Sequence, residues 1–253
     1  GCSIVADGLD AYAPLHWLRS VYNPRSKRIL LNGHLNEHQR TYQLAKELGF
    51  NELGLKERPW ASNFLRVNSF EEVLNNYKAA YFAVAILVNR GSFVNDIGQF
   101  FAQEKWEANG LLRLMEKYQA SPEVLFQRFN VLTKDFGLDK VFFQRVVHDL
   151  DRDAFDMDKE LHLNRRHQPH ATGLGEHYCR RWLAVSLLRE LQSHQAPQLS
   201  ESLTPKKSGS ESSIAIGVQR AVFVATGEEY LCIAIAKPGH PTPGRNVSVT
   251  LGV

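Results

Sequence analysis

The chain has 253 residues, of which 43% are hydrophobic and 23% are charged. This balance is typical of a folded globular protein and argues against long-range disorder. The formal net charge of +3 is too small to predict nucleic-acid binding from bulk charge. The three cysteines, Cys2, Cys179 and Cys232, are scattered and odd in number, which excludes a disulfide framework and favours a reducing, cytoplasmic compartment.

The N-terminal part of the sequence predicts a β-hairpin followed by a helix. Residues 17–22 and 29–31 read as two strands joined by a turn at Asn23-Pro24. A helix is expected over residues 36–48 because its apolar residues fall on one stripe, and Gly49 is expected to be its C-cap.

A long helix is predicted to begin after Ser69. Ser69 is followed three residues later by Glu72, which is the spacing of a capping box. The helix should run to about residue 88 and, being apolar on most sides, should be the central core helix. Three further helices are expected at residues 93–103, 107–118 and 121–136.

The second half of the chain predicts a mixture of strands and one helix. Residues 141–147 are rich in Val and Phe and predict a strand, whereas residues 151–176 are polar and His-rich and predict a surface loop. An amphipathic helix is expected at residues 179–191, followed by a Ser-, Pro- and Lys-rich linker at 193–213. The remaining strands are expected at residues 214–218, 221–226, 230–236 and 247–251.

These elements predict an α+β fold with two domains. Residues 1–140 should form a mostly helical domain with a small hairpin sheet. Residues 141–253 should form an α+β domain, GAF-like in outline, with an antiparallel sheet. No membrane association is expected, because the longest apolar run, residues 79–88, is far shorter than the roughly 20 residues that span a bilayer.

One string has the spacing of an inverted zinc-peptidase motif. His34, Glu37 and His38 match H-x-x-E-H, in which two His side chains hold zinc and the Glu acts as general base. The string straddles the expected helix start, so a solvated helix N-terminus is the simpler interpretation. A zinc metallopeptidase using these three residues is the alternative function.

A second group of metal-binding residue types lies in the polar segment. No C-x-x-C or H-x-x-x-H spacing organises these residues, so a polar surface loop is the preferred interpretation over a metal site. A nucleophilic cysteine beside a histidine is a weaker possibility, because positions i and i+2 point apart on a helix. The group consists of His162, His167, His170, His177 and Cys179.

The most distinctive apolar string is YKAAYFAVAIL at residues 77–87. It is typical of a buried core helix. Its alanines, two tyrosines and single lysine are also what a slot for an anionic, partly apolar ligand would need. The sequence leaves both interpretations open.

Five strings together resemble the sensor region of the short-chain fatty acyl-CoA regulators (the RamB/PrpR group), which are helix-turn-helix transcription factors of the XRE class. The resemblance covers roughly residues 17–253. Its strings are RTYQLAKELG (40–49), YKAAYFAVAIL (77–87), SPEVLFQRFNVL (121–132), VFFQRV (141–146) and EHYCRRW (176–182).

The resemblance implies a domain related to the ImmA/IrrE metallopeptidases whose peptidase chemistry is lost. The corresponding helix is expected to be that of residues 37–43, which lacks HExxH, and the position of the downstream Glu ligand falls near Tyr77 or Lys78. The chain is therefore expected not to be an enzyme and to hold no metal or other cofactor. Three scattered cysteines do not supply the ligands of an iron–sulfur cluster.

The resemblance also implies partners. The chain is expected to be a fragment of a longer protein whose DNA-binding helix-turn-helix lies outside it, and to form a homodimer. A protein-interaction module without a small-molecule ligand is a third possibility.

The effector implied by the resemblance is an acyl-CoA or related metabolite. Its phosphates need Arg or Lys, and its acyl-pantetheine arm needs a slot of aromatic and small side chains. The alternative for each cation is a surface position or a structural ion pair. The predicted phosphate contacts are Arg40, Lys78, Arg128 and Arg145, and the predicted acyl-arm contacts are Tyr77, Tyr81 and Phe82.

Overall fold

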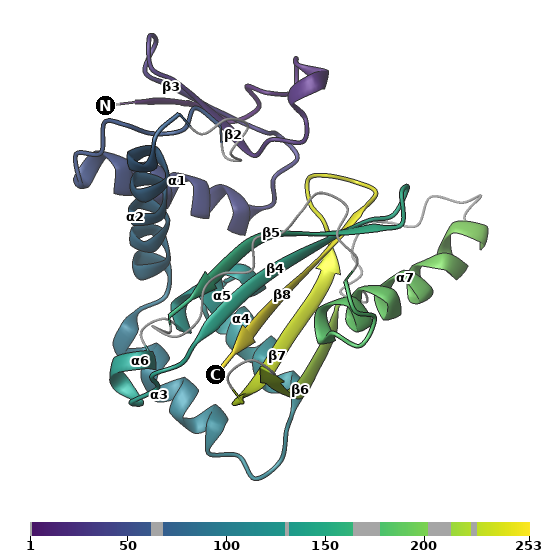
Figure 1. Cartoon of the computed structure of the whole chain (residues 1–253). Helices are drawn as coiled ribbons and strands as arrows, with labels where there is room; N and C mark the ends of the chain where they lie inside the picture. The colour runs from purple at the N-terminus through teal and green to yellow at the C-terminus, as the bar shows by residue number, and fades with distance from the viewer. Residues whose placement is uncertain (1, 62–67, 130–131, 164–177, 202–213, 224–226) are drawn as a thin grey trace. The chain divides into compact units, whose positions relative to one another are not determined.

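The computed structural model describes residues 2–61, 68–129, 132–163, 178–201, 214–223 and 227–253 (Figure 1). The chain divides into two compact units, each described by itself. Unit 1 comprises Gly1–Gln103, Leu111–Arg128 and His240–Thr242, and unit 2 comprises Glu104–Gly110, Phe129–Gly239 and Pro243–Val253.

Unit 1 begins with a three-stranded sheet of order β1-β3-β2. The predicted hairpin is confirmed, because β2 and β3 pair in antiparallel fashion with Tyr22 opposite Ile29. Asn23 forms the turn by accepting hydrogen bonds from the backbone N–H groups of Arg25 and Ser26. The elements are β1 (Ser3–Val5), a 3-10 turn η1 (Ala13–Leu15), β2 (Ser20–Asn23) and β3 (Arg28–Leu31).

The predicted helices of the first half are present, with shifted ends. Helix α1 begins with a capping box, in which Asn36 and Gln39 exchange side-chain to backbone hydrogen bonds of 2.9 and 3.2 Å. Ser69 caps α2 as predicted, but the carboxylate of Glu72 accepts from the backbone N–H of Asn68 instead of from Ser69. The helices are α1 (Glu37–Glu52), α2 (Phe70–Leu87), α3 (Arg90–Phe101), α4 (Ala108–Lys117) and α5 (Pro122–Arg128).

The prediction that Gly49 ends α1 is wrong. The helix continues to Glu52, and the residue with positive φ is Gly54 at +62°. Gly49 serves close packing instead, because a Cβ there would lie 3.0 Å from the backbone oxygen of Ala79 and 3.0 Å from the ring of Phe82. The missing side chain lets α2 approach α1.

Helix α2 is less central than predicted. Asn75, Ala79, Ala83 and Val84 form its buried side, whereas several large apolar side chains on the rest of its surface are exposed. The exposed ones are Phe70, Tyr77, Tyr81 and Ile86.

A polar clamp joins α3 to α4. The hydroxyl of Tyr118 donates a 2.6 Å hydrogen bond to Asp96, and the ammonium of Lys117 donates a second one of 2.8 Å. Partial burial alone would raise the pKa of Asp96, but these two donors outweigh it and lower the pKa.

The predicted helix at 121–136 is divided. Pro122 is the first helical residue, as expected, but α5 ends at Arg128, and α6 (Leu132–Asp135) follows after residues 130–131, which lie outside the described chain.

Unit 2 is built on a five-stranded antiparallel sheet of order β5-β4-β8-β7-β6, with α7 running along one face (Figure 1). Leu188 and Leu191 of α7 pack against Val146, Ala234 and Ala236 of the sheet. The elements are β4 (Phe142–Asp149), β5 (Ala154–His162), α7 (Leu183–Glu201), β6 (Ala215–Phe223), β7 (Glu228–Pro238) and β8 (Arg245–Gly252).

Several boundaries in unit 2 correct the sequence analysis. The predicted polar loop contains strand β5, whose charges are tolerated because it is an edge strand. The predicted strands 214–218 and 221–226 form the single strand β6, because its pairing with β7 is continuous from Ala215 to Phe223. Helix α7 begins at Leu183 instead of 179 and extends into the predicted linker, of which residues 202–213 lie outside the described chain.

The predicted α+β class is confirmed by these helices and two sheets. Among the described residues, no helix is long and apolar enough to cross a membrane.

Substituting Gly252 by Ala should destabilise the chain. The added Cβ would lie 2.0 Å from the ring of Phe142, which is held in turn by Tyr230, with ring centroids 5.1 Å apart. Overpacking of this kind costs about 1–3 kcal/mol, measurable by urea unfolding. Gly91→Ala is the control, because its nearest atom would be 3.5 Å away; equal stability of the two variants would contradict the packing argument.

Candidate functional site

A small hollow in unit 1 surrounds the side chain of Glu47; we call it the Glu47 hollow. Its free volume is about 10 Å³, far below the roughly 300–1,000 Å³ of sites that take small organic ligands. It is lined by Ser20 and Tyr22 of β2, by Gln43, Lys46, Glu47 and Phe50 of α1, by Asn76 of α2, and by Arg58, Pro59, Trp60 and Ala61 of the segment between these helices.

The guanidinium of Arg58 fills the centre of the Glu47 hollow. Its two terminal nitrogens donate hydrogen bonds of 2.7 and 2.5 Å to the two carboxylate oxygens of Glu47. Its central carbon lies 4.0 Å from the ring centroid of Tyr22 and 3.9 Å from that of Phe50. The side chains of Arg58 and Glu47 are only 11% and 10% exposed, so water screens this ion pair weakly.

Local structure brings these groups together. Glu47 and Phe50 are three residues apart on α1 and therefore share a face of the helix. Tyr22 comes from β2, and its backbone N–H donates a 2.7 Å hydrogen bond to the carbonyl of Trp60. A bridge between Val21 and Ala61 fixes the same segment to the strand. The backbone on both sides of the hollow is thus held independently of the Arg58 side chain.

The wall of the hollow is electrically neutral at Tyr22. Burial raises the pKa of its phenol, the neighbouring Cys2 raises it further, and the Arg58 guanidinium acts in the opposite direction. The net pKa lies above its usual value near 10, so the ring stays uncharged at neutral pH and presents its π face to the cation.

Residues 46–50 of α1 read K-E-L-G-F, which is the length and spacing of H-E-x-x-H. Lys46 and Phe50 stand where that motif has its two metal-binding histidines, and both are buried. An ammonium has no lone pair and a phenyl ring offers no donor atom. The residues present therefore do not fit a zinc ion, although Glu47 stands where the H-E-x-x-H spacing has its Glu.

The assignment of residues 37–43 to the peptidase motif stays a prediction. These residues begin the same helix α1, and Gln43 is one of the residues that line the hollow. The H-E-x-x-H spacing is found at residues 46–50 of the same helix, and the side chain that α2 contributes to the hollow is Asn76, one position before Tyr77. The signal was present in the sequence as a K-E-x-x-F string on one helix face.

The N-terminal part of the chain matches a known family model. Residues 13–130 match the family model of the IrrE N-terminal-like domain, Peptidase_M78. This confirms the predicted ImmA/IrrE-like domain. No curated protein matches the chain.

One similar solved structure bears the name "Mycobacterium tuberculosis transcriptional regulator". The TM-score is 0.59 at 18% sequence identity, and the match covers 100% of this chain and 66% of that one. The chain thus spans just under two thirds of that protein's length, and the likeness establishes a shared fold.

None of the seven predicted effector contacts lines the Glu47 hollow. Tyr77, Lys78 and Tyr81 lie together on an exposed part of α2, where Lys78 is 4.0 Å from Glu71. Phe82 packs near Gly49, and Arg40 donates to the carbonyls of Gly33 and Leu35.

The other two predicted phosphate contacts hold structural positions. Arg128 is 5% exposed at the end of α5, and Arg145 of β4 forms a two-bond ion pair with Asp158 of β5. Ligand contact by any of the seven residues stays a prediction.

The predicted metal candidates do not form a site in the described chain. His34 precedes α1, whereas Glu37 and His38 are in its first turn, and all three are exposed. His162 belongs to β5 and contacts Glu160 at 2.7 Å, while His167, His170 and His177 lie outside the described residues. Among the described residues, no three His, Cys, Asp or Glu side chains gather closely enough to hold a metal ion.

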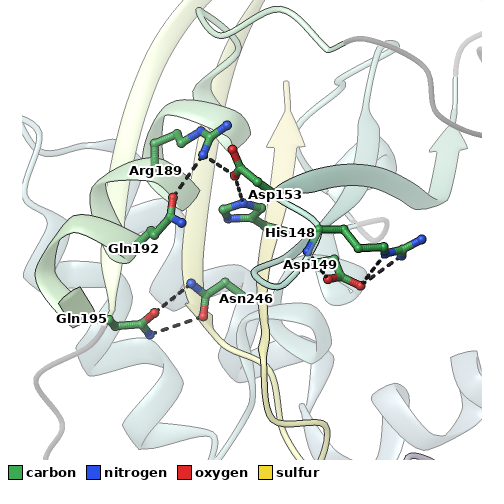
Figure 2. Close-up of polar contacts among 8 residues, drawn as sticks. His148, Asp149, Asp153, Arg189, Gln192, Gln195 and Asn246 are labelled. Carbon is green, nitrogen blue, oxygen red and sulfur yellow. Dashed lines mark hydrogen bonds and ion pairs between the residues drawn. The ribbon is translucent and has the colours of Figure 1, made fainter. Parts of the chain in front are cut away.

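Unit 2 contains a second polar cluster, at the contact of α7 with β4 and β8 (Figure 2). The fully buried ring of His148 contacts Asp153 at 2.8 Å and stacks on Phe155, with ring centroids 4.2 Å apart. Arg189 of α7 forms an ion pair with the same Asp153 carboxylate. One exposed carboxylate therefore joins the sheet to the helix.

An amide pair continues this cluster along α7. Gln195 and Asn246 of β8 exchange hydrogen bonds of 3.3 and 3.0 Å (Figure 2). Sequence patterns reveal neither the Arg189–Asp153 ion pair nor this amide pair, because the partners are 36 and 51 residues apart.

Asp153→Asn should lower the melting temperature at pH 7, and the difference from wild type should vanish in acid. The hydrogen bonds from Arg189 and then from His148 lower the pKa of Asp153 below its usual value. A carboxylate with a lowered folded-state pKa stabilises the fold above its unfolded-state pKa of about 3.9, and this contribution is lost as the pH falls through the folded-state value.

Thermal unfolding between pH 7 and pH 2 measures this difference. Asp151→Asn removes the same charge two residues away and is the control. If the melting temperature of Asp153→Asn stays below that of wild type by the same amount down to the lowest pH, the carboxylate charge does not cause the difference.

Proposed function

We propose that this chain is the ligand-sensing and dimerising region of a bacterial XRE-class transcriptional regulator, and that it is not an enzyme. The observation that carries the proposal is the content of the Glu47 hollow. An IrrE-like domain has Lys and Phe in place of the two motif histidines, and its remaining Glu is bound by an arginine. The similar solved structure that bears the name of a transcriptional regulator also supports the proposal of a regulator.

Peptidase chemistry requires groups that are engaged here. In an H-E-x-x-H enzyme the Glu acts as general base on a metal-bound water. In this chain both carboxylate oxygens of Glu47 accept hydrogen bonds from Arg58. The carboxylate is therefore engaged by a cation of the chain itself, which is not the arrangement in which the motif Glu acts on a water.

We propose a short-chain acyl-CoA or a related metabolite as the effector. The Glu47 hollow is too small for a pantetheine arm, so the effector would bind elsewhere. Of the predicted contacts, Tyr77, Lys78 and Tyr81 are accessible on one helix. Arg145 would first have to exchange the carboxylate of Asp158 for a phosphate.

Effector binding would act on a two-state equilibrium between dimer geometries. A ligand that prefers one geometry shifts the population toward it and so repositions the DNA-binding helix-turn-helix domains, which we place outside this chain. The size of the response is limited by the difference in affinity for the two states.

Acyl-CoAs should raise the melting temperature of the chain. Free CoA, which lacks the acyl group, is the reference that measures how much of the shift the acyl group contributes. A ligand at about 100 times its Kd stabilises a protein by about 2.7 kcal/mol. Thermal shift with acetyl-, propionyl- and butyryl-CoA measures the effect. Absence of a shift with every acyl-CoA would reject the effector, and stoichiometric zinc with peptide cleavage would reject the sensor in favour of a metallopeptidase.

Lys78→Glu should reduce the acyl-CoA shift at least several-fold, because a carboxylate repels the ligand's phosphates. Lys56→Glu is the control, since it makes the same charge change at an exposed position in the segment after α1. If both variants and wild type show equal shifts in melting temperature, the α2 site is excluded, whereas the acyl-CoA remains the proposed effector.

A further inference from the structure

The carboxylate of Glu47 is bound by an organic cation of the chain itself, the guanidinium of Arg58. We propose that Tyr22, Glu47 and Phe50 form a guanidinium-binding cage, and that Arg58 is its built-in ligand in place of a divalent metal. The site is defined by contacts within unit 1 and is independent of the acyl-CoA proposal.

The geometry suits a planar cation. A guanidinium offers parallel in-plane N–H groups to a carboxylate and flat faces to aromatic rings. The cage supplies both kinds of partner, with two hydrogen bonds to Glu47 and two rings within 4.0 Å of the guanidinium carbon. A lysine ammonium at the same place could not make the paired, in-plane contacts.

The burial of Glu47 makes a counter-charge necessary. Its side chain is 10% exposed, and a buried carboxylate without a cation is strongly unfavourable. In H-E-x-x-H proteins the neighbouring metal ion supplies positive charge. In this chain Arg58 supplies it, so removing Arg58 leaves a preformed acceptor for another cation.

The surroundings disfavour a divalent ion. Lys46 adds a second positive charge to the wall, with its Nζ 5.9 Å from the ring centroid of Phe50. The aromatic walls give no metal-ligating atom, whereas they attract a delocalised monovalent cation. The expected ligand class is therefore guanidinium compounds, including arginine side chains.

The backbone leaves the cage in place when the Arg58 side chain is removed. Residues 60 and 61 are fixed to β2 through the Tyr22–Trp60 hydrogen bond and the Val21–Ala61 bridge. Neither contact uses the side chain of Arg58. Arg58→Ala should therefore fold with the cage open.

Chemical rescue tests the proposal. Arg58→Ala should melt below wild type, and millimolar methylguanidinium should raise its melting temperature by about 2–4 °C in a saturable manner. Methylammonium and NaCl at equal ionic strength should give less than half of this shift. Wild type, whose cage is filled, should show no saturable rise.

Two variants separate the cage from general ion effects. Glu47→Gln combined with Arg58→Ala should lose the rescue, because the carboxylate acceptor is gone. Arg220→Ala breaks the exposed ion pair with Glu229 and should not be rescued. Equal rescue by methylammonium, rescue of the double variant, or tight stoichiometric zinc binding by Arg58→Ala would each overturn the proposal.

A measurement on the wild-type chain covers the case in which Arg58→Ala fails to fold. The side-chain protons of Arg58 should show upfield NMR shifts from the rings of Tyr22 and Phe50, and its guanidinium N–H signals should be resolved by slowed rotation. Arg58→Lys should melt below wild type despite keeping the charge. Random-coil shifts for Arg58, or full stability of Arg58→Lys, would contradict the cage.

Discussion

The buried carboxylate of Glu47 is the constraint on which the N-terminal unit depends. A charge that is 10% exposed must be matched by a cation with good hydrogen-bond geometry, or the fold loses several kcal/mol. Arg58 meets this need, and its guanidinium also lies against the ring of Tyr22 on the hairpin strand β2. The helices, the hairpin and the connecting segment therefore meet at one ion pair.

The same constraint determines what the hollow can do. In an H-E-x-x-H site the two histidines and a metal leave the Glu available for proton transfer. Here the two histidine positions of that spacing hold Lys46 and Phe50, and Arg58 binds the carboxylate of Glu47. The hollow therefore holds a paired carboxylate and guanidinium, surrounded by residues of α1, α2 and β2.

The C-terminal unit relies on a different kind of cross-link. Helix α7 covers its sheet mainly through aliphatic contacts, and the polar contacts lie at one end of that interface. There the single carboxylate of Asp153 contacts both His148 of the sheet and Arg189 of the helix (Figure 2). Because this carboxylate is exposed, salt screens its ion pair more than the buried pair in unit 1.

Local signals in the sequence determined much of the secondary structure. The turn at Asn23, the cap at Ser69 and the proline at the start of α5 act through hydrogen bonds and backbone angles within four residues, so the prediction and the structure agree. Polarity misled the prediction for β5, because an edge strand can carry charges that resemble those of a loop. The role of Gly49 was predicted wrongly because the residues it packs against, Ala79 and Phe82, lie on another helix.

The family-related motifs were visible in the sequence itself, and so was the K-E-L-G-F string of α1 with its H-E-x-x-H spacing. The position of that string in the site was not. Only the tertiary structure placed Arg58 between the carboxylate of Glu47 and the ring of Tyr22, which lies 36 residues away in the chain. Sequence spacing reports which groups share one helix face, whereas the pairing of charges across a hollow depends on how separate elements pack.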